Sequence, residues 1–425
     1  MELDTSTQAA AAQNTKALRI NGSRLWQSLM DLAQIGGTEK GGVCRLALTE
    51  LDRQGRDQFT QWTREAGCTI RVDAIGNIFA RRAGVDDTLP PVMTGSHIDT
   101  QPTGGKFDGN YGVMAGIEVL RTLNDAGIRT QAPLEVAVWT NEEGSRFVPV
   151  MMGSGVFVGA FTLEHALKAE DHDGTSVATA LKQIGYAGEA GPAHAVGAYF
   201  EAHIEQGPVL ENNEKVIGVV QAALGQRWYD VTVHGMEAHA GPTPMELRKD
   251  ALLAASSLVQ AVNRIAVERK PYARGTVGSL EVFPNSRNVI PGSVKFSVDL
   301  RAPDDAQLSD MDAAIRSACE RVAQESGLQI DIEQVVYFPP QPFTPELVEA
   351  VRANAADLGL SAMDCVSGAG HDAVYIARVA PAAMIFVPCA DGISHNEIEA
   401  AEPAHLEAGC NVLLRAMLSS AGVAA

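Results

Sequence analysis

Residues 89–143 read LPPVMTGSHIDTQPTGGKFDGNYGVMAGIEVLRTLNDAGIRTQAPLEVAVWTNEE. LPPVMTGS predicts a buried strand that ends just before His97, and PLEVAVWT predicts another that ends at Glu142 and Glu143. Between them, YGVMAGIEVLRTLNDAG has helical periodicity with a glycine stop at Gly127. Alternating strands and helices indicate a largely parallel sheet that is covered on both faces. In such sheets the ligand site lies beyond the carboxyl ends of the strands, where His97 and the glutamate pair fall.

Similar strand ends recur along the chain, each followed by a residue that can bind metal. EAHIEQGPVLE and GISHNEIE supply two more histidines, and GGKFDGNYG supplies an aspartate in a glycine-rich loop. The ordered set of candidate metal ligands is His97, Asp108, Glu143, His203 and His395. A shared carboxylate with two ligands on either side is typical of a dinuclear zinc-type site, and the spare Glu142 could activate water there.

Each of these residues also has a simpler interpretation. His97 could be an ordinary strand-end histidine, and Asp108 could be a turn residue or a helix cap. The Glu142-Glu143 pair could be a solvated acidic turn, but the uniformly apolar strand before it argues against that. Asp99 could hold the second ring nitrogen of His97 in the tautomer that a metal ligand requires. The ordered set as a whole favours a metal-dependent hydrolase.

The later part of the chain has a different order of elements. From about Gln226 it predicts a βαββαβ series, in the segments RWYDVTVHG, DALLAASSLVQAVNRIA, GTVGSLEVF, SVKFSVDLR, DAQLSDMDAAIRSACERVAQESG and LQIDIEQVVYF. AAMIFVPCADGISHNEIE then returns to the pattern of a strand followed by a ligand. The predicted fold is therefore α/β, with a mostly parallel-sheet catalytic domain of zinc-hydrolase type and an inserted ferredoxin-like domain. The expected boundaries are 19–212 and 331–425 for the catalytic domain and 213–330 for the insertion, after a disordered tail over 1–18.

Composition narrows the class of protein. The chain has 425 residues, enough for more than one domain, and a formal net charge of -19. That charge argues against nucleic acid or anionic membrane as a partner, because both select for basic surfaces. Six scattered cysteines without a C-x-x-C pair suggest reduced thiols, and no apolar run approaches the ~18 residues of a membrane span. We therefore expect a cytoplasmic enzyme.

These motifs resemble the metallopeptidase M20 family, and within it the amidases of hydantoinase/carbamoylase type. That branch holds N-carbamoyl-L-amino-acid hydrolases, β-ureidopropionases and allantoate amidohydrolases. The resemblance covers roughly residues 20 to 415, including the insertion. In the peptidase and aminoacylase relatives an aspartate or glutamate usually stands where this chain has His203. A histidine within AHIEQGP is similar to the carbamoyl-cleaving branch.

The resemblance implies roles for the site residues. Asp108 would bridge two divalent metal ions, with His97 and His203 completing one site and Glu143 and His395 the other. Glu142 would be the general base. The inserted domain would mediate homodimerisation and act as a lid, and its His239 would stabilise the oxyanion in the partner's active site. The implied substrate-binding residues are Gln206, Asn285, Arg287, Gly370 and His371, although His371 could equally be structural at a helix start.

Together these observations predict a cytoplasmic, homodimeric amidohydrolase with two metal ions. It would cleave the carbamoyl C–N bond of an N-carbamoyl-L-amino acid or N-carbamoyl-β-alanine, giving amino acid, ammonia and carbon dioxide. Zinc, manganese, cobalt or nickel would suit the histidine and carboxylate ligands. Three alternatives remain: an allantoate amidohydrolase, a dipeptidase or aminoacylase, and a metal-bound relative without catalysis. The retained Glu142 argues against the last of these.

Overall fold

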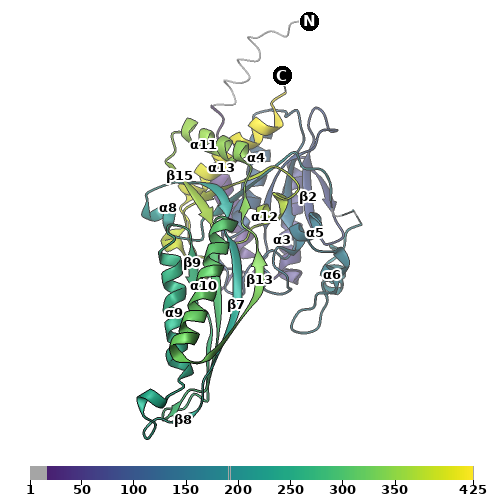
Figure 1. Ribbon diagram of the computed structural model, residues 1–425. Helices are drawn as coiled ribbons and strands as arrows, with labels where there is room; N and C mark the ends of the chain where they lie inside the picture. Colours follow the sequence, from purple (N-terminus) through teal and green to yellow (C-terminus); the bar gives the residue numbers. More distant parts are fainter. Residues whose placement is uncertain (1–16, 190, 192, 425) are drawn as a thin grey trace. The chain divides into compact units, whose positions relative to one another are not determined.

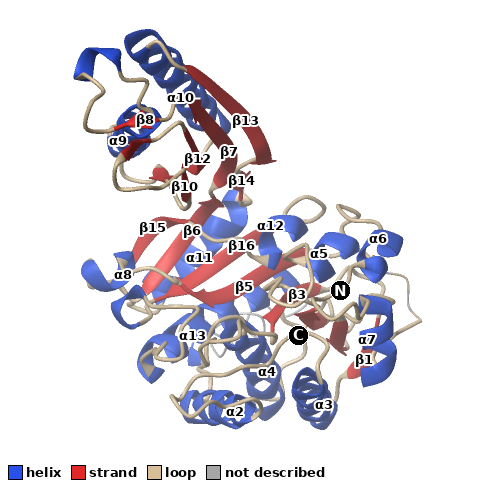
Figure 2. Cartoon of the chain, turned by 90° about the horizontal axis from the view of Figure 1, so that it is seen from below, coloured by secondary structure: helices blue, strands red, loops and turns tan. Residues whose placement is uncertain are grey.

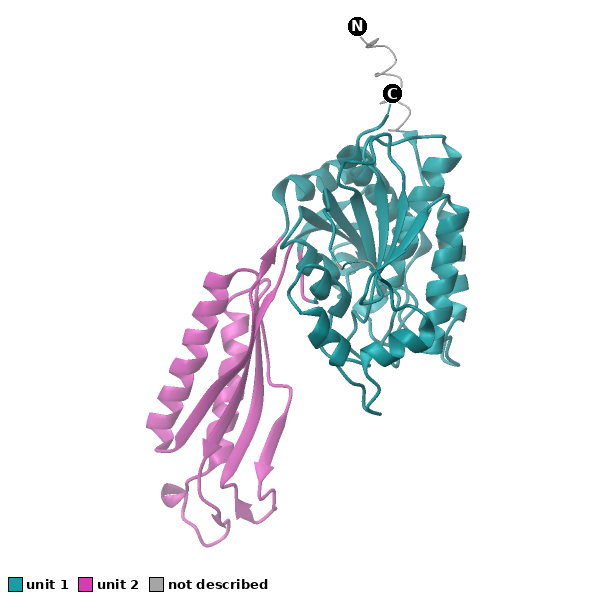
Figure 3. Ribbon diagram, turned by 90° about the vertical axis from the view of Figure 1, so that its right-hand side faces the viewer, with its two compact units in different colours: residues 1–221, 343–365, 369–425 teal, residues 222–342, 366–368 magenta. Residues whose placement is uncertain are grey.

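The computed structural model describes residues 17–189, 191 and 193–424, and the chain divides into two compact units (Figure 3). The larger unit comprises the chain up to Gln221 together with 343–365 and 369–425, and the smaller unit comprises 222–342 and 366–368. The predicted disordered tail falls mainly on residues 1–16, which lie outside the described residues. Leu18, within the predicted tail, packs against the core of the larger unit.

The larger unit is built on one sheet, whose strand order is β1-β2-β4-β3-β5-β16-β6-β14, with β15 paired to β6. Figure 1 labels β2 and β15 of this sheet. The strands are β1 (Thr69–Val72), β2 (Ile78–Arg82), β3 (Val92–His97), β4 (Leu134–Trp139), β5 (Ala198–Ile204), β6 (Ile217–Ala223), β14 (Gln341–Pro342), β15 (Ala362–Ser367) and β16 (Ala382–Val387). The four central strands β4, β3, β5 and β16 run parallel to one another. Every residue of these four strands is buried, as a sheet covered on both faces requires.

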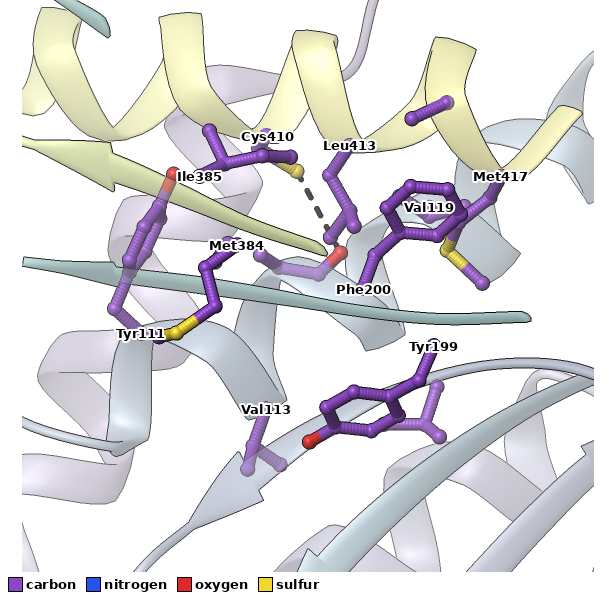
Figure 4. Close-up of a cluster of buried hydrophobic side chains, with 14 of the residues drawn as sticks. Tyr111, Val113, Val119, Tyr199, Phe200, Met384, Ile385, Cys410, Leu413 and Met417 are labelled. Carbon is purple, nitrogen blue, oxygen red and sulfur yellow. Dashed lines mark hydrogen bonds between the residues drawn. The ribbon is translucent and has the colours of Figure 1, made fainter. Parts of the chain in front are cut away.

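Helices cover this sheet on both faces. They are α2 (Gly22–Gln34), α3 (Glu50–Glu65), α4 (Asn110–Asp125), α5 (Met152–Phe157), α6 (Leu163–Lys168), α7 (Val177–Ile184), α8 (Val209–Asn212), α11 (Pro345–Asp357), α12 (Asp372–Ile376) and α13 (Pro403–Ala421). Side chains alternate along β5. Phe200 lies among Leu413 and Met417 of α13, and Tyr199 points to the opposite side of the strand (Figure 4). On that opposite side, Glu201 accepts the backbone N–H of Ala373 in α12 at 2.8 Å.

The smaller unit is an antiparallel sheet with two long helices, as Figure 2 shows. Its elements are β7 (Gly225–His234), β8 (Ala238–His239), α9 (Ala251–Val267), β9 (Arg274–Thr276), β10 (Leu280–Phe283), β11 (Val289–Ile290), β12 (Ser293–Ala302), α10 (Asp305–Ser326) and β13 (Gln329–Phe338). Buried residues alternate with more exposed ones along β12, because one face of the sheet packs on α9 and α10. The predicted fold class, a mostly parallel catalytic sheet with a βαββαβ insertion, is confirmed.

The boundaries of the insertion differ from the predicted 213–330. β6 (Ile217–Ala223) pairs with β16 through Val219 and Ile385, so it stays almost entirely in the catalytic sheet. β13 extends to Phe338 and pairs with β7, so the smaller unit continues to Pro342. The predicted strand GTVGSLEVF is split into β9 and β10. Thr276 lies opposite Asp299 of β12 and Leu280 lies opposite Phe296, so the chain from 276 to 280 is one residue longer than the part of β12 that it faces. One extra residue there bulges the strand.

Two further observations bear on the expected environment. No helix in the described part of the chain combines the length and apolarity that crossing a bilayer requires. All six cysteines fall within the described residues and are free, five of them buried and Cys44 partly buried.

Candidate active site

Four neighbouring parallel strands bring the predicted metal ligands to one edge of the sheet. His97 is the last residue of β3, and Glu142 and Glu143 follow β4. His203 lies on β5, one residue before its end, and His395 follows β16. Because β4, β3, β5 and β16 are adjacent in this order, side chains that are far apart in the sequence meet at their carboxyl ends.

Asp108 lies at the centre of this cluster, in the loop before α4. Its Oδ1 is 3.7 Å from Nε2 of His97 and 3.3 Å from Nε2 of His203. Its Oδ2 is 3.2 Å from Nε2 of His395, which in turn lies 3.3 Å from Oε2 of Glu143. The residue after Asp108 has to be small, because a Cβ on Gly109 would come within 2.4 Å of the His97 ring. Each oxygen of Asp108 therefore faces its own group of ligand atoms.

The spacing of these atoms fits metal binding. Two donor atoms held tetrahedrally at about 2.1 Å from one ion lie roughly 3.4 Å apart. The measured separations of 3.2–3.7 Å around Asp108 match that value. The described residues contain two such groups that share Asp108, namely His97, Asp108, His203 and Asp108, Glu143, His395. Imidazole and carboxylate donors in these numbers suit zinc and neighbouring transition metals.

Two of the histidines are oriented by their second ring nitrogen. Nδ1 of His97 lies 2.9 Å from the backbone oxygen of Asp99, and Nδ1 of His203 lies 2.9 Å from that of Ile204. An Nδ1–H that donates to a carbonyl leaves the Nε2 lone pair free for a metal. The expected contact between Asp99 and the second nitrogen of His97 is present and is made by the backbone carbonyl, since the carboxylate Oδ1 of Asp99 is 3.9 Å from Nδ1. That carboxylate instead accepts the backbone N–H groups of Glu142 and Glu143, at 3.3 and 3.2 Å.

The protonation of the cluster reflects the concentration of acids in it. Burial raises the pKa of Glu142 well above its usual range, and the nearby carboxylates of Asp372 and Glu143 raise it further. Burial lowers the pKa of His203, but the hydrogen bond and charge of Asp108 outweigh it and raise the value to about 9. Asp108 and Glu143 raise the pKa of His395 to about 10. Such a cluster attracts cations, because cations remove the repulsion between its carboxylates.

Glu142 is the acid that neither metal group needs. Its Oε2 lies 3.5 Å from Nε2 of His97, and the residue is only 8% exposed. Glu142 also lines a cavity of about 150 Å³ beside the cluster. A carboxyl group beside both metal groups and open to a cavity can exchange a proton with a molecule that binds there.

The cavity also contains three of the predicted substrate-binding residues. Its lining consists of His97, Gln101, Asp108, Glu142, Glu143, Val150, Met151, His203, Gln206, Ala369, Gly370, His371 and His395. Nε2 of Gln206 donates to Oδ2 of Asp108 at 2.8 Å, and its buried Oε1 has no partner among the described residues. That oxygen can accept a hydrogen bond from a ligand N–H. Burial lowers the pKa of His371 well below its usual range, and the nearby His203 lowers it further.

The other three predicted functional residues belong to the smaller unit, where all are exposed. His239 lies on β8 and pairs with Val289 of β11, and Ala240 donates to the carbonyl of Asn288 at 2.8 Å. The segment that carries Asn285 and Arg287 therefore runs beside the one that carries His239. Asn285 has a left-handed backbone with φ 56°.

Sequence reasoning missed several residues that shape the site. Glu399 is 4% exposed, and its Oε1 accepts the backbone N–H groups of Phe107 and Asp108 at 2.8 and 3.1 Å. Its Oε2 accepts the Ser394 hydroxyl at 3.0 Å. Gln101 donates to Oε2 of Glu143 at 2.8 Å. The one available signal for Glu399 was its place four residues after His395 in GISHNEIE.

Backbone strain is concentrated around the cavity. Of the eight non-glycine residues with left-handed φ in the described chain, Met151, Gln206 and His395 line the cavity and Asn141 precedes Glu142. Each such residue costs on the order of 1–3 kcal/mol and persists where the surrounding structure holds it in place. Strained residues of this kind tend to cluster at functional sites.

Comparisons with known proteins agree with this geometry. The model of peptidase family M20/M25/M40 matches residues 93–419. An N-carbamoyl-L-amino-acid amidohydrolase of Rhizobium meliloti is 48% identical over 406 residues, covering 95% of this chain and 98% of the relative. An allantoate amidohydrolase of Bacillus subtilis is 36% identical over 385 residues, covering 90% of this chain and 93% of the relative. The crystal structure of a hydantoinase/carbamoylase family amidase from Burkholderia multivorans, 57% identical, matches with a TM-score of 0.93 and covers 95% of this chain and 99% of that one.

Proposed function

Since the chain belongs to peptidase family M20/M25/M40 and is a hydrolase of amide C–N bonds, we propose that it cleaves the carbamoyl C–N bond of N-carbamoyl-L-amino acids or N-carbamoyl-β-alanine. The main support for this proposal is that Asp108 belongs to both groups of candidate metal ligands. Glu142 lies beside these groups but belongs to neither of them. The similarity to N-carbamoyl-L-amino-acid amidohydrolases supports the choice of substrate.

Two divalent ions are part of the proposal. His97, His203 and Oδ1 of Asp108 would hold one, and Glu143, His395 and Oδ2 of Asp108 would hold the other. Zinc is the first choice, and manganese, cobalt and nickel suit the same donors. When bound, the ions supply Lewis acidity that polarises the carbamoyl oxygen and makes water a stronger acid.

Glu142 then acts as general base and general acid. It takes a proton from the water that attacks the carbamoyl carbon, and it returns this proton to the amino-acid nitrogen as the C–N bond breaks. The carbamic acid that remains decomposes to ammonia and carbon dioxide. Asp99 positions Glu142 for this step, because its carboxylate accepts the backbone N–H groups of Glu142 and Glu143.

The substrate is held by its polar ends. Arg287 would bind the carboxylate with both prongs of its guanidinium group, with Asn285 beside it. Gln206 and His371 would contact the ureido group from the cavity, and Gly370 would contact the remainder of the substrate. In a homodimer, His239 of one subunit would stabilise the oxyanion in the other. We place the enzyme in the cytoplasm on the basis of its free cysteines.

The decisive experiment offers the purified, metal-loaded enzyme several substrates side by side. These are N-carbamoyl-L-amino acids, N-carbamoyl-β-alanine, allantoate, a dipeptide and an N-acetyl amino acid, with ammonia and free amine as readouts. We expect the highest kcat/KM for an N-carbamoyl amino acid. A preference for allantoate would favour the second candidate, which the Bacillus subtilis relative supports. The Glu142→Gln variant provides the background rate for every substrate.

A further inference from the structure

Three residues of the cavity lining are apolar and have no role in the proposed mechanism, whereas most of the lining is polar or charged. They are Val150, Met151 and Ala369, which we call the apolar wall. Apolar side chains in a polar catalytic cavity contact the part of a substrate that is not reacting. In the proposed function this wall would adjoin the side chain of the amino acid, which differs from one substrate to another.

The backbone fixes the direction of Met151. This residue has φ 49° and ψ 38°, a left-handed conformation that is rare for a side chain of this kind. Its N–H donates to the carbonyl of Glu142 at 2.7 Å, and its own carbonyl accepts the N–H of Gly155 at 2.9 Å. The next residue, Met152, donates to the carbonyl of Asn141 at 3.2 Å. Met151 is thus anchored directly to the loop that carries the general base.

The Met151 side chain occupies the space beside Gly370. A Cβ placed on Gly370 would lie 3.0 Å from Cε and 3.2 Å from Sδ of Met151. The thioether therefore fills the volume that a larger residue at 370 would need, and Met151 is only 8% exposed although it lines the cavity. Val150 packs in the same way on Gly144, where a Cβ would lie 2.4 Å from Cγ1 of Val150.

The space that remains is small. The cavity measures about 150 Å³, whereas typical small-molecule pockets hold roughly 300–1,000 Å³. Much of it adjoins the metal-ligand cluster, where the ureido group has to bind in the proposed function. Only the part beside Met151 and Gly370 is left for a substituent next to the ureido nitrogen.

We propose that Met151, packed against Gly370, sets the size of the substrate side chain that the enzyme accepts. The inference rests on the proposed function and adds its specificity: short or flexible aliphatic N-carbamoyl-L-amino acids are preferred over those with an indole ring. Methionine suits this task because its unbranched, polarisable side chain adapts to aliphatic groups of different length. It narrows the space that a bicyclic group would need.

The test compares kcat/KM for N-carbamoyl-L-alanine and N-carbamoyl-L-tryptophan across a set of variants. Met151→Ala widens the wall, Gly370→Ala narrows it, and the double variant combines them. Val148→Ala is the matched control, because Val148 lies in the same loop but is 70% exposed and outside the cavity lining. Metal content and thermal unfolding are measured for each protein.

We expect Met151→Ala to raise the tryptophan-to-alanine ratio of kcat/KM by about tenfold or more, the scale on which pocket size discriminates substrates. Gly370→Ala should lower the ratio, and the double variant should recover it. Val148→Ala should leave it unchanged. If Met151→Ala does not fold, the selective loss in Gly370→Ala decides the matter, because Gly370 is exposed and has no left-handed φ.

Two results would overturn the inference, and they are distinguishable. A wild-type enzyme that hydrolyses both substrates, with the same ratio in every metal-loaded variant, refutes the role of Met151 and leaves the proposed function intact. A wild-type enzyme that releases no ammonia from either substrate refutes the proposed function and this inference together.

Discussion

The carboxylate of Glu399 accepts the backbone N–H of Asp108 at 3.1 Å, so one buried acid positions the residue that faces three histidines. The same side chain accepts the hydroxyl of Ser394, the residue before His395. Oγ of Ser394 also lies 2.8 Å from Oδ2 of Asp108, so the two carboxyl groups compete for its single proton. Glu399 therefore joins the loop of the central carboxylate to the loop of a histidine 287 residues further along the chain.

Removing Glu399 should weaken metal binding without removing a ligand. Glu399→Ala leaves the backbone N–H groups of Phe107 and Asp108 buried without a partner, at a cost of about 1–3 kcal/mol each. We expect a 10- to 100-fold loss of metal affinity, the usual scale for groups that orient ligands. Glu399→Gln keeps an accepting oxygen and should lose far less. Competition titrations with a chelating dye measure both, and equal losses in the two variants would contradict the positioning role.

The number of ions lost should depend on which ligand is removed. Asp108→Ala takes a donor from both groups and should leave less than one ion per chain. His395→Ala affects only the group with Glu143 and should leave about one ion, since the other group keeps its three donors. His172→Ala, a change at a fully exposed histidine, is the control. Elemental analysis after dialysis counts the ions, and equal losses in Asp108→Ala and His395→Ala would argue against a shared carboxylate.

The two neighbouring glutamates should respond differently to the same change. Glu142→Gln should keep its metal and lose about 10²-fold or more in kcat, because an amide cannot take a proton from water. Glu143→Gln should lose metal, because its carboxylate belongs to the group with Asp108 and His395. Metal content and kcat measured on the same preparations separate the two effects. The reverse pattern would exchange the roles of base and ligand.

The sequence predicted the parts of this molecule that depend on local pattern. Apolar runs that lead up to His97 and to Glu142-Glu143 predicted two strands. Because the ligand site of a parallel sheet lies beyond the carboxyl ends of its strands, these residues were expected to lie in one site. Glu399 could not be found in this way, because it acts on Phe107 across 292 residues through a backbone contact. Met151 was not predicted, because nothing in the sequence indicates that a methionine at this position adopts a left-handed backbone conformation. Asp99 was assigned to the correct histidine, but only the structure shows that its backbone carbonyl makes the contact.

Arg287 should tolerate lysine poorly if it binds the substrate carboxylate. An ammonium group cannot reproduce the two-pronged contact of a guanidinium group, so Arg287→Lys should lower kcat/KM for carboxylate substrates severely. Metal content and the unfolding temperature should not change, because Arg287 is exposed. Arg321→Lys, at another exposed arginine of the smaller unit, is the matched control. Unchanged kinetics in Arg287→Lys would remove this residue from the site.

The proposed cross-subunit role of His239 can be tested by complementation. His239→Ala and Glu142→Gln should each be nearly inactive alone. A mixed dimer contains one active site with both native residues, so it should recover up to about half of the wild-type activity per dimer under the proposed pairing. Two different affinity tags isolate the mixed species. An inactive mixed dimer would mean that His239 acts within its own chain or not at all.

The attachment of the smaller unit has a consequence for how this protein can be rearranged. β6 leads into the unit and β14 leads out of it, and the two strands are paired, with Ala223 opposite Gln341 and Ala222 opposite Pro342. Paired strands lie about 4.8 Å apart, a gap that a two-residue Asn-Gly turn closes. Residues 224–340 therefore begin and end at one hairpin neck, and the register of β6 on β16 is kept outside it by Val219 and Ile385. The polypeptide is discontinuous in the larger unit, but its sheet is not, so we expect a chain with an Asn-Gly turn in place of residues 224–340 to keep this sheet.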